Sequence, residues 1–235
     1  MGQEVAIVVG VGPGLGWSLA RRFATAGMKV VAAARGPGKL DALRRAEPAL
    51  EVRAEACDAS RAADVERLFS TVERELGIPA LVVFNAGTYE RGGILDITPE
   101  AFERCWRVGC FGGFLVGQAA ARLMVPAGAG TIIFTGATAS LRGSAGFANL
   151  AAPKFGLRAL AQSMARELGP KGIHVAHSII DGQIESERSR HLAAERGPDS
   201  LLPPEAIAES YYQLHRQPRG AWTQELDLRP WVEKF

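Results

Sequence analysis

The chain has 235 residues, of which 47% are hydrophobic, and this length is enough to bury the core of one α/β domain. Its formal net charge is only +2, so the charge balance indicates neither a nucleic-acid partner nor binding to an anionic membrane surface. Cys57, Cys105 and Cys110 form no CxxC pair, which favours reduced thiols. We find no secretory signal and no long apolar span, and we therefore expect a cytoplasmic protein without a membrane segment.

Short apolar runs alternate with helical patterns along the whole chain. The first run, residues 4–9, ends in a glycine-rich turn over residues 10–16, and a helical pattern begins directly after this turn. Further runs typical of buried strands lie at residues 30–34, 51–56, 80–84, 130–135 and 174–180, with a last strand expected within 221–228. Helical patterns cover residues 39–47, 63–76, 99–107, about 112–124, about 154–168 and 204–215, and Asp58-Ala59-Ser60 offers an N-cap for the second of these.

Apolar strands that alternate with helices predict a parallel sheet covered on both faces. Right-handed crossovers then give a doubly wound, Rossmann-type α/β sheet of about seven strands. No linker divides the chain, so we expect a single domain over residues 1–235. Ligands of such sheets bind beyond the carboxyl ends of the strands. Residues 181–215, which are rich in Gly and Pro as far as Pro204, are interpreted as a lid region beside this site.

The glycine-rich turn is a candidate phosphate-binding site, with a plain structural turn as the alternative. It reads Gly10-Val11-Gly12-Pro13-Gly14-Leu15-Gly16, between a strand and a helix whose N-terminal N–H groups can receive a phosphate. The spacing does not fit the Gly-x-Gly-x-x-Gly fingerprint. It resembles the short-chain dehydrogenase/reductase family, whose pattern is Thr-Gly-x-x-x-Gly-x-Gly, with Val9 in place of the Thr.

Three further segments carry the resemblance, which extends from Val5 to about Ser186. Asn85-Ala86-Gly87 is similar to the family's Asn-Asn-Ala-Gly, and Cys57-Asp58 to the strand end whose Asp contacts adenine. The segment from Asp181 to Ser186, which includes Gly182 and Ile184, is similar to the Pro-Gly-x-Ile-x-Thr segment beside the nicotinamide, with Asp181 replacing the Pro. The resemblance implies an NAD(P)-binding domain, a small-molecule substrate and a homodimer or homotetramer.

The candidate cofactor-binding residues also include Arg35, which bears on the choice between NADP(H) and NAD(H). An acidic residue that selects NAD is expected about 20 residues beyond the glycine turn. The sequence there is Ala33-Ala34-Arg35-Gly36, without Asp or Glu. The planar guanidinium of Arg35 can pair with a 2′-phosphate, and Lys39 is a second candidate cation. We therefore predict a preference for NADP(H), with NAD(H) as the alternative.

The catalytic part of the pattern departs from the family, whose tetrad is Asn, Ser, Tyr and Lys. Lys154 matches the Lys, whereas the other three positions read Gly109, Ala137 and Leu150. None of these three side chains can move a proton or donate a hydrogen bond. Thr138 or Ser140 is a candidate replacement for the Ser, and the resemblance implies that Lys154 binds the nicotinamide ribose. Lys154 and Thr138 are therefore the candidate catalytic residues.

Three kinds of function are consistent with these residues. The first is an oxidoreductase with an atypical site, which acts mainly by holding hydride donor and acceptor together. The second is a cofactor-binding regulator or assembly subunit without redox turnover, and the third is a cyclase or isomerase that reuses the pocket. Fold alone does not choose between them. His174 and His177 have odd spacing on a strand, so they lie on opposite faces and we expect no metal site.

Overall fold

The computed structural model describes residues 2–36 and 38–233; the side chain of Lys39 also lies outside its described part, so the second cation predicted there stays untested. The strands of the described residues form one parallel sheet in the order β3-β2-β1-β4-β5-β6-β7. The strands are β1 Val5–Val9, β2 Lys29–Ala34, β3 Val52–Ala56, β4 Leu81–Phe84, β5 Gly130–Thr135, β6 Ile173–Ile180 and β7 Glu225–Leu228. This arrangement confirms the predicted Rossmann-type doubly wound sheet.

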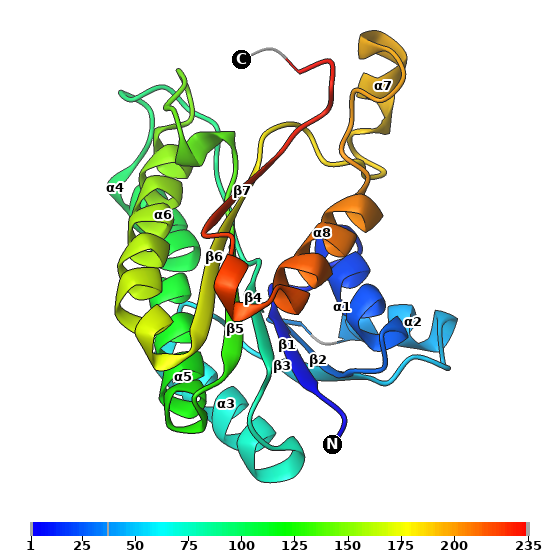
Figure 1. The fold of residues 1–235 in the computed structure, drawn as a ribbon. Coiled ribbons are helices and arrows are strands. Elements are labelled where there is room, and N and C mark those ends of the chain that lie inside the picture. The colour runs from blue at the N-terminus through cyan, green and yellow to red at the C-terminus, as the bar shows by residue number, and fades with distance from the viewer. Residues whose placement is uncertain (1, 37, 234–235) are drawn as a thin grey trace.

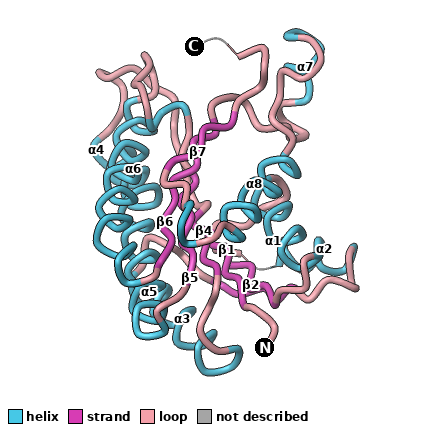
Figure 2. Tube along the Cα trace, viewed as in Figure 1, coloured by secondary structure: helices cyan, strands magenta, loops and turns pink. Residues whose placement is uncertain are grey.

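Helices cover both faces of this sheet, as Figures 1 and 2 show. One face carries α3 (Ala62–Leu76), α5 (Gly112–Ala127) and α6 (Ala148–Leu168), with α4 (Pro99–Trp106) beside them. The other face carries α1 (Leu15–Thr25), α2 (Gly38–Ala46) and α8 (Pro204–Arg216). The short helix α7 (Arg190–Arg196) and the C-terminal segment lie at the end of the molecule where the strands end.

The alternation of side chains along β1 explains why every residue of this strand is apolar. Val5, Ile7 and Val9 belong to the core cluster under α3, α5 and α6. Ala6 and Val8 belong to the opposite cluster, under α1 and α8. Since successive side chains of a strand point to opposite faces, a strand covered on both sides must be apolar at each position.

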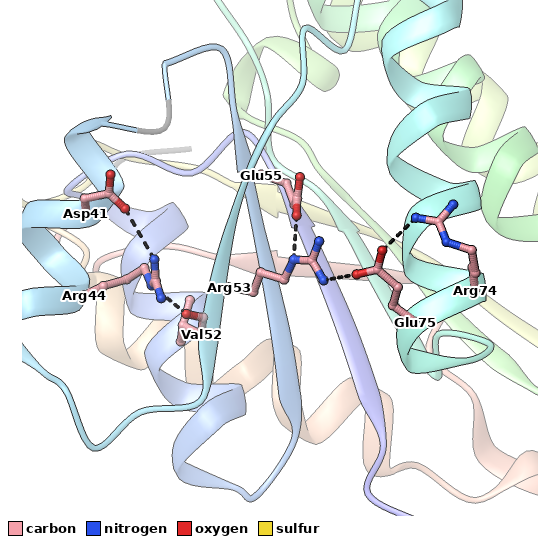
Figure 3. Close-up of polar contacts among 7 residues, drawn as sticks. All are labelled: Asp41, Arg44, Val52, Arg53, Glu55, Arg74 and Glu75. Carbon is pink, nitrogen blue, oxygen red and sulfur yellow. Dashed lines mark hydrogen bonds and ion pairs between the residues drawn. The ribbon is translucent and has the colours of Figure 1, made fainter.

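The edge strand β3 differs from the central strands because it carries charged side chains. Arg53 forms ion pairs with Glu55 of the same strand and Glu75 of α3, and Arg44 of α2 donates to the backbone oxygen of Val52 at 2.7 Å (Figure 3). Charged side chains on an open edge disfavour the addition of a strand from another chain. The sheet is therefore protected at β3.

A continuous helical run replaces the two separate helices that the sequence predicts at 99–107 and 112–124. Five residues of π-helix, Arg107–Phe111, join α4 to α5, and Gly128 ends the run with φ +63°. By length and composition alone, the run Pro99–Ala127 is long and apolar enough to cross a membrane. A core helix passes the same test, and Val116, Ala120 and Met124 are fully buried in the core.

Two local expectations need correction. Helix α3 begins at Ala62 with Arg61 at its N-cap, so Asp58-Ala59-Ser60 does not cap it; the Asp58 carboxylate instead accepts from the backbone N–H and hydroxyl of Ser60 at 3.0 and 2.7 Å. Within the predicted lid region, residues 204–215 belong to α8, which buries Ile207, Ala208, Tyr211 and Leu214. Only residues 181–203 remain a candidate lid, and their mobility stays a prediction.

Candidate functional site

A cleft of about 520 Å³ opens where the strand order of the sheet reverses, at the carboxyl ends of β1, β2 and β4. Such a switch point is the usual ligand site of a doubly wound sheet. The cleft is lined by four strand-end segments, Val9–Pro13, Ala34–Gly36, Cys57 with Ala59, and Asn85–Gly87, together with Leu40, Leu43 and Val108. The structure thus brings together Gly10, Gly12, Pro13, Arg35, Cys57, Asn85, Ala86 and Gly87 of the predicted cofactor site.

Gly10 locks the glycine-rich turn against the turn after β4. Its φ is +95°, and a Cβ added to it would lie 2.4 Å from the backbone nitrogen of Ala86, so only glycine fits here. The Asn85 side-chain amide donates to the Gly10 oxygen at 2.9 Å, and the Gly10 N–H donates to the Ala33 oxygen at 2.9 Å. The floor of the cleft is therefore held by hydrogen bonds and close backbone packing between three strand ends.

The N-terminus of α1 directly follows the lining segment Val9–Pro13 and suits an anion, although Gly14, Leu15 and Gly16 themselves lie outside the lining. Added Cβ atoms at Gly12 and Gly14 would meet nothing within 4 Å, which leaves open space in front of the first helical turn. No side chain caps α1 at Gly14, and its first turn holds no acidic residue. The uncapped N–H groups can therefore receive a phosphate. Leu15 is buried, and a Cβ at Gly16 would lie 2.7 Å from the Val11 Cα, so both residues hold the helix close to the turn.

Arg35 and Cys57, which follow β2 and β3, also line the cleft. Arg35 is exposed at the end of β2, and among the described contacts it takes part in no ion pair. Burial raises the pKa of the Cys57 thiol to about 11, which keeps it neutral. Asp58 itself is not part of the lining, although both of its neighbours are. Its predicted contact with adenine stays untested.

Lys154 is buried inside the molecule and is not a solvated surface lysine. Its ammonium donates to the backbone oxygen of Thr135, at the end of β5, at 2.6 Å. An added Cβ at Gly87 would lie 3.8 Å from Nζ, so the ammonium also faces the turn after β4. Burial lowers the pKa of Lys154 to about 8. The ammonium is therefore placed at the border between the cofactor cleft and the end of β5.

The three positions that lack the family's catalytic side chains lie around Lys154. Leu150 is half-buried one turn before Lys154 on α6, and Ala137 is half-buried just beyond β5. Gly109 is buried in the π-helical segment, where an added Cβ would lie 3.1 Å from the Cβ of Pro153. Gly109 thus makes room for Pro153. No pattern in the sequence predicts that these two residues are in contact.

Of the two hydroxyls considered as replacements for the missing Ser, Ser140 is withdrawn from the site. It is fully buried, its Oγ accepts from the backbone N–H of Ala137 at 3.1 Å, and it lies 3.4 Å from Nε2 of His177. Thr138 remains half-buried. Its hydroxyl donates to Oδ1 of Asp181 at 2.6 Å. Thr138 is therefore the candidate hydroxyl at this strand end.

Asp181 is a site residue whose role the sequence does not reveal, although its replacement of the family's Pro marks the position. Its carboxylate is fully buried, with Arg229 Nη2 at 3.0 Å from Oδ2 and Arg142 Nη2 at 3.9 Å from Oδ1. Arg229 also pairs with Asp227 at 2.6 Å. A buried carboxylate requires such partners because an isolated charge is costly to desolvate.

Gly182 and Ile184 follow Asp181 and lie outside the lining of the cleft. Gly182 has φ +155°, and an added Cβ would lie 2.7 Å from Cδ of Pro230. Ile184 forms an isolated parallel bridge with Leu202. The C-terminal segment therefore packs on the predicted nicotinamide segment, whose contact with the cofactor stays a prediction.

A tyrosine hydroxyl does approach the end of β5, but from the opposite face of the sheet. Tyr211 of α8 donates to Oγ1 of Thr135 at 3.0 Å and is fully buried. Burial raises the pKa of Tyr211 to about 12. It therefore stays protonated inside the core and does not replace the tyrosine missing at position 150. In the part of the chain that the structure describes, no group of three or more His, Cys, Asp or Glu residues is placed to hold a metal.

The comparisons with known proteins agree with this geometry. The sequence profile of the short chain dehydrogenase family matches residues 4–197. The 3-oxoacyl-[acyl-carrier-protein] reductase MabA of Mycobacterium avium is 33% identical over 186 residues, which are 79% of this chain and 69% of that protein.

Solved structures resemble nearly the whole chain. A short-chain dehydrogenase from Rhodopseudomonas palustris is 39% identical, with a TM-score of 0.84 over 97% of this chain and 99% of that one. A metagenomic short-chain oxidoreductase, crystallised in complex with NADP, is 28% identical, with a TM-score of 0.83 over 97% of this chain and 98% of that one. This protein therefore belongs to the short-chain dehydrogenase family of nicotinamide-dependent oxidoreductases.

Proposed function

We propose that this protein is an NADP(H)-dependent oxidoreductase that transfers hydride to or from a small molecule without a tyrosine acid or base. The observation that carries the proposal is the cleft at the switch point, which is lined by Arg35 and by the turn Gly10–Pro13 that leads into the uncapped N-terminus of α1. Its volume of about 520 Å³ falls within the range typical of ligand and cofactor sites.

The residues of the cleft suit the parts of a dinucleotide. The backbone of Gly12 and Gly14 and the N-terminus of α1 would hold the pyrophosphate, and Arg35 would pair with the 2′-phosphate. Lys154 would donate to the nicotinamide ribose, since its Nζ faces both Gly87 and the end of β5. When bound, the nicotinamide supplies or accepts a hydride.

Catalysis at this site rests on positioning. Leu150 and Ala137 cannot supply the proton that reduction of a ketone requires, and a positioned proton donor typically contributes about 10²–10⁴ in rate. Holding donor and acceptor in reactive contact can itself contribute several kcal/mol, about 7–11 in favourable cases. The chain's own residues therefore bind and orient the dinucleotide and the substrate, and they exclude water.

The same missing side chains favour a second function, a dinucleotide-binding regulator or assembly subunit without turnover. Leu150, Ala137 and Gly109 are apolar, and the buried Ser140 is not placed to replace a donor. A non-redox cyclase or isomerase in the same pocket is a weaker third alternative. We further propose a cytoplasmic homodimer or homotetramer that acts on a small-molecule substrate.

Two measurements on the purified protein test the proposal. Mass spectrometry of the denatured protein should identify NADP⁺ or NADPH released from it, and absorbance at 340 nm should then report NADPH oxidation with a panel of carbonyl, imine and activated alkene substrates. Turnover with any of them supports an oxidoreductase. Tight NADPH binding without turnover on the whole panel would favour the regulatory alternative, and failure to bind either dinucleotide would contradict both.

A further inference from the structure

Thr138 and Asp181 meet just beyond the carboxyl ends of the neighbouring strands β5 and β6. Thr135 of β5 pairs with Ser178 of β6, and Thr138 and Asp181 each lie three residues beyond this pair. The backbone oxygen of Thr135 also accepts from the ammonium of Lys154. The Thr138 hydroxyl and the Lys154 ammonium are therefore held at the same strand end.

The direction of the Thr138 hydrogen bond limits what this hydroxyl can bind. A threonine hydroxyl has a single hydrogen, and that of Thr138 is donated to Oδ1 of Asp181 at 2.6 Å. Asp181 is fully buried and its other oxygen, Oδ2, pairs with Arg229, which fixes the position of Oδ1 as the acceptor of this bond. Oγ1 of Thr138 consequently has lone pairs to offer and no hydrogen to donate.

The charge in direct contact with this hydroxyl is negative. Oδ1 of Asp181 lies 2.6 Å from Oγ1 of Thr138, and the charges of Asp181 and Asp227 offset those of Arg142 and Arg229 within the same cluster. Lys154 approaches from α6, and although burial lowers its pKa to about 8, it keeps most of its positive charge at neutral pH. The Asp181 carboxylate behind Oγ1 therefore favours a donor N–H that carries positive charge.

We propose that the site takes a substrate in which the reacting carbon is bonded to a protonated nitrogen, a C=N–H iminium, whose N–H donates to Oγ1 of Thr138. This inference rests on the proposed oxidoreductase function and names its substrate class. A ketone oxygen offers only lone pairs to Oγ1 and is disfavoured at this position. Thr138 is thus a specificity-determining residue and Asp181 the positioning residue that orients it.

The chemistry of iminium reduction matches the side chains that are missing. The electron pair and hydrogen of the reduced nicotinamide form the new C–H bond, while the π pair of the C=N bond becomes the lone pair of the amine nitrogen. The dinucleotide is oxidised and the iminium is reduced to a neutral amine, with no proton transferred. A site that lacks Tyr and Ser at positions 150 and 137 can therefore complete this reaction, whereas reduction of a ketone leaves an alkoxide without a proton donor.

Binding of product analogues tests the contact independently of turnover. We would titrate the protein saturated with NADP⁺ by calorimetry with 1,2,3,4-tetrahydroisoquinolinium, which has N–H donors, and with its N,N-dimethyl analogue, which has none. Thr138→Val should weaken binding of the first about 10- to 100-fold and leave the second unchanged, because only the first loses a charge-assisted hydrogen bond. Thr138→Ser should restore binding, and unchanged melting temperatures establish that both variants fold.

Turnover gives the second readout. NADPH should be oxidised with 3,4-dihydroisoquinolinium much faster than with the matched ketone 1-tetralone, and Thr138→Val should remove most of this preference. Four outcomes would each overturn the inference: an equal loss of binding for both ammonium ions, no loss of binding for either ion, faster reduction of the ketone than of the imine, or no imine turnover by protein that binds NADPH. None of these outcomes would contradict the dinucleotide site. Failure to bind any dinucleotide would overturn the proposed function as well.

Discussion

At the scale of single residues, the position of Arg35 gives the sharpest statement about cofactor choice. The side chain is exposed, lines the cleft, and makes no ion pair among the described contacts, so its charge is available for a 2′-phosphate. Arg35→Ala should therefore weaken NADPH binding by about 10-fold or more and change NADH binding little, as fluorescence titration would measure.

The matched control for Arg35→Ala is Arg45→Ala, which removes another exposed arginine of the same region, on α2, outside the lining of the cleft. It should leave both affinities unchanged. Equal NADPH and NADH affinities in the unmutated protein would contradict the predicted preference for NADP(H).

Restoring the missing proton donor is a second prediction at this scale. Leu150→Tyr places a phenol near Lys154, whose pKa is already lowered to about 8 by burial, and Ala137→Ser adds a hydroxyl for the substrate oxygen. Because residues that act as a unit are strongly non-additive, the double variant should raise ketone reduction by more than the product of the single variants.

The measurement is NADPH oxidation with small ketones from pH 5 to 10 on the parent, both single variants and the double variant. The parent should lack the pH dependence of a tyrosine tuned by a lysine. Efficient ketone reduction by the parent, with such a pH dependence, would mean that the catalytic acid lies elsewhere.

Sequence and structure differ most at the residue scale. The glycine turn and Asn85 are recognisable because each directly follows one strand, and Lys154 is recognisable because it matches the Lys of the family's tetrad. The ion pairs of Asp181 with Arg142 and Arg229 join side chains far apart in sequence, so no local pattern predicts them. The fit of Gly109 to Pro153 is likewise a tertiary contact between two helices.

At the scale of elements, a buried histidine on β6 is expected to make folding stability fall at acid pH. His177 is fully buried on this strand, and burial, followed by the charge of Lys154, lowers its pKa to about 4; Glu225 raises it and Arg158 lowers it further. The unfolded chain binds a proton near pH 6.5 and the folded chain does not, so folding stability is lost as the pH falls from about 6.5 to 4.

His177→Gln should remove this loss, which amounts to about 3 kcal/mol at most between the two pKa values. Urea unfolding at pH 7 and pH 4.5 would measure the difference for the parent and the variant. His191→Gln, which replaces an exposed histidine on α7, is the control and should leave the pH dependence as it is. An identical acid loss in the parent and His177→Gln would contradict the assignment.

The boundaries of several elements were not predictable from local signals. The pattern separates residues 99–107 from 112–124, yet a π-helical segment joins them because Gly109, Gly112 and Gly113 allow close packing against Pro153, Ala59 and Leu157. The lid region interpreted over residues 181–215 was too long, because Gly and Pro occur only as far as Pro204, whereas the helix predicted over residues 204–215 is α8, whose apolar face packs into the core beside α1.

At the scale of the whole molecule, the fold was predictable because alternating strands and helices admit few topologies. The surface through which the molecule associates was less predictable. Phe102, Trp106 and Phe114 on α4 and α5 remain 38%, 40% and 41% exposed, and Trp106 stacks on Phe111 with ring centroids 5.7 Å apart. Phe155 on α6 is 44% exposed. Exposed aromatic side chains on neighbouring helices are typical of an interface.

We therefore predict a dimer or tetramer by light scattering at micromolar concentration. Phe114→Glu should shift the protein toward the monomer, because a charge in an apolar interface is costly to desolvate. Ile78→Glu, which alters an apolar residue that is 46% exposed between α3 and β4, should not change the mass. A parent protein that is monomeric under these conditions would count against this prediction.

The most direct test of the account is a calorimetric titration with NADPH of the parent, Gly12→Asp and Gly220→Asp. An added Cβ at either glycine meets nothing within 4 Å, so both variants should fold with unchanged melting temperatures. Gly12 lines the cleft, and a carboxylate there would repel the pyrophosphate. We predict one NADPH per chain for the parent and for Gly220→Asp, and a loss of affinity of about 100-fold or more for Gly12→Asp. No saturable binding by the parent, or equal affinities for all three proteins, would contradict the proposed dinucleotide site.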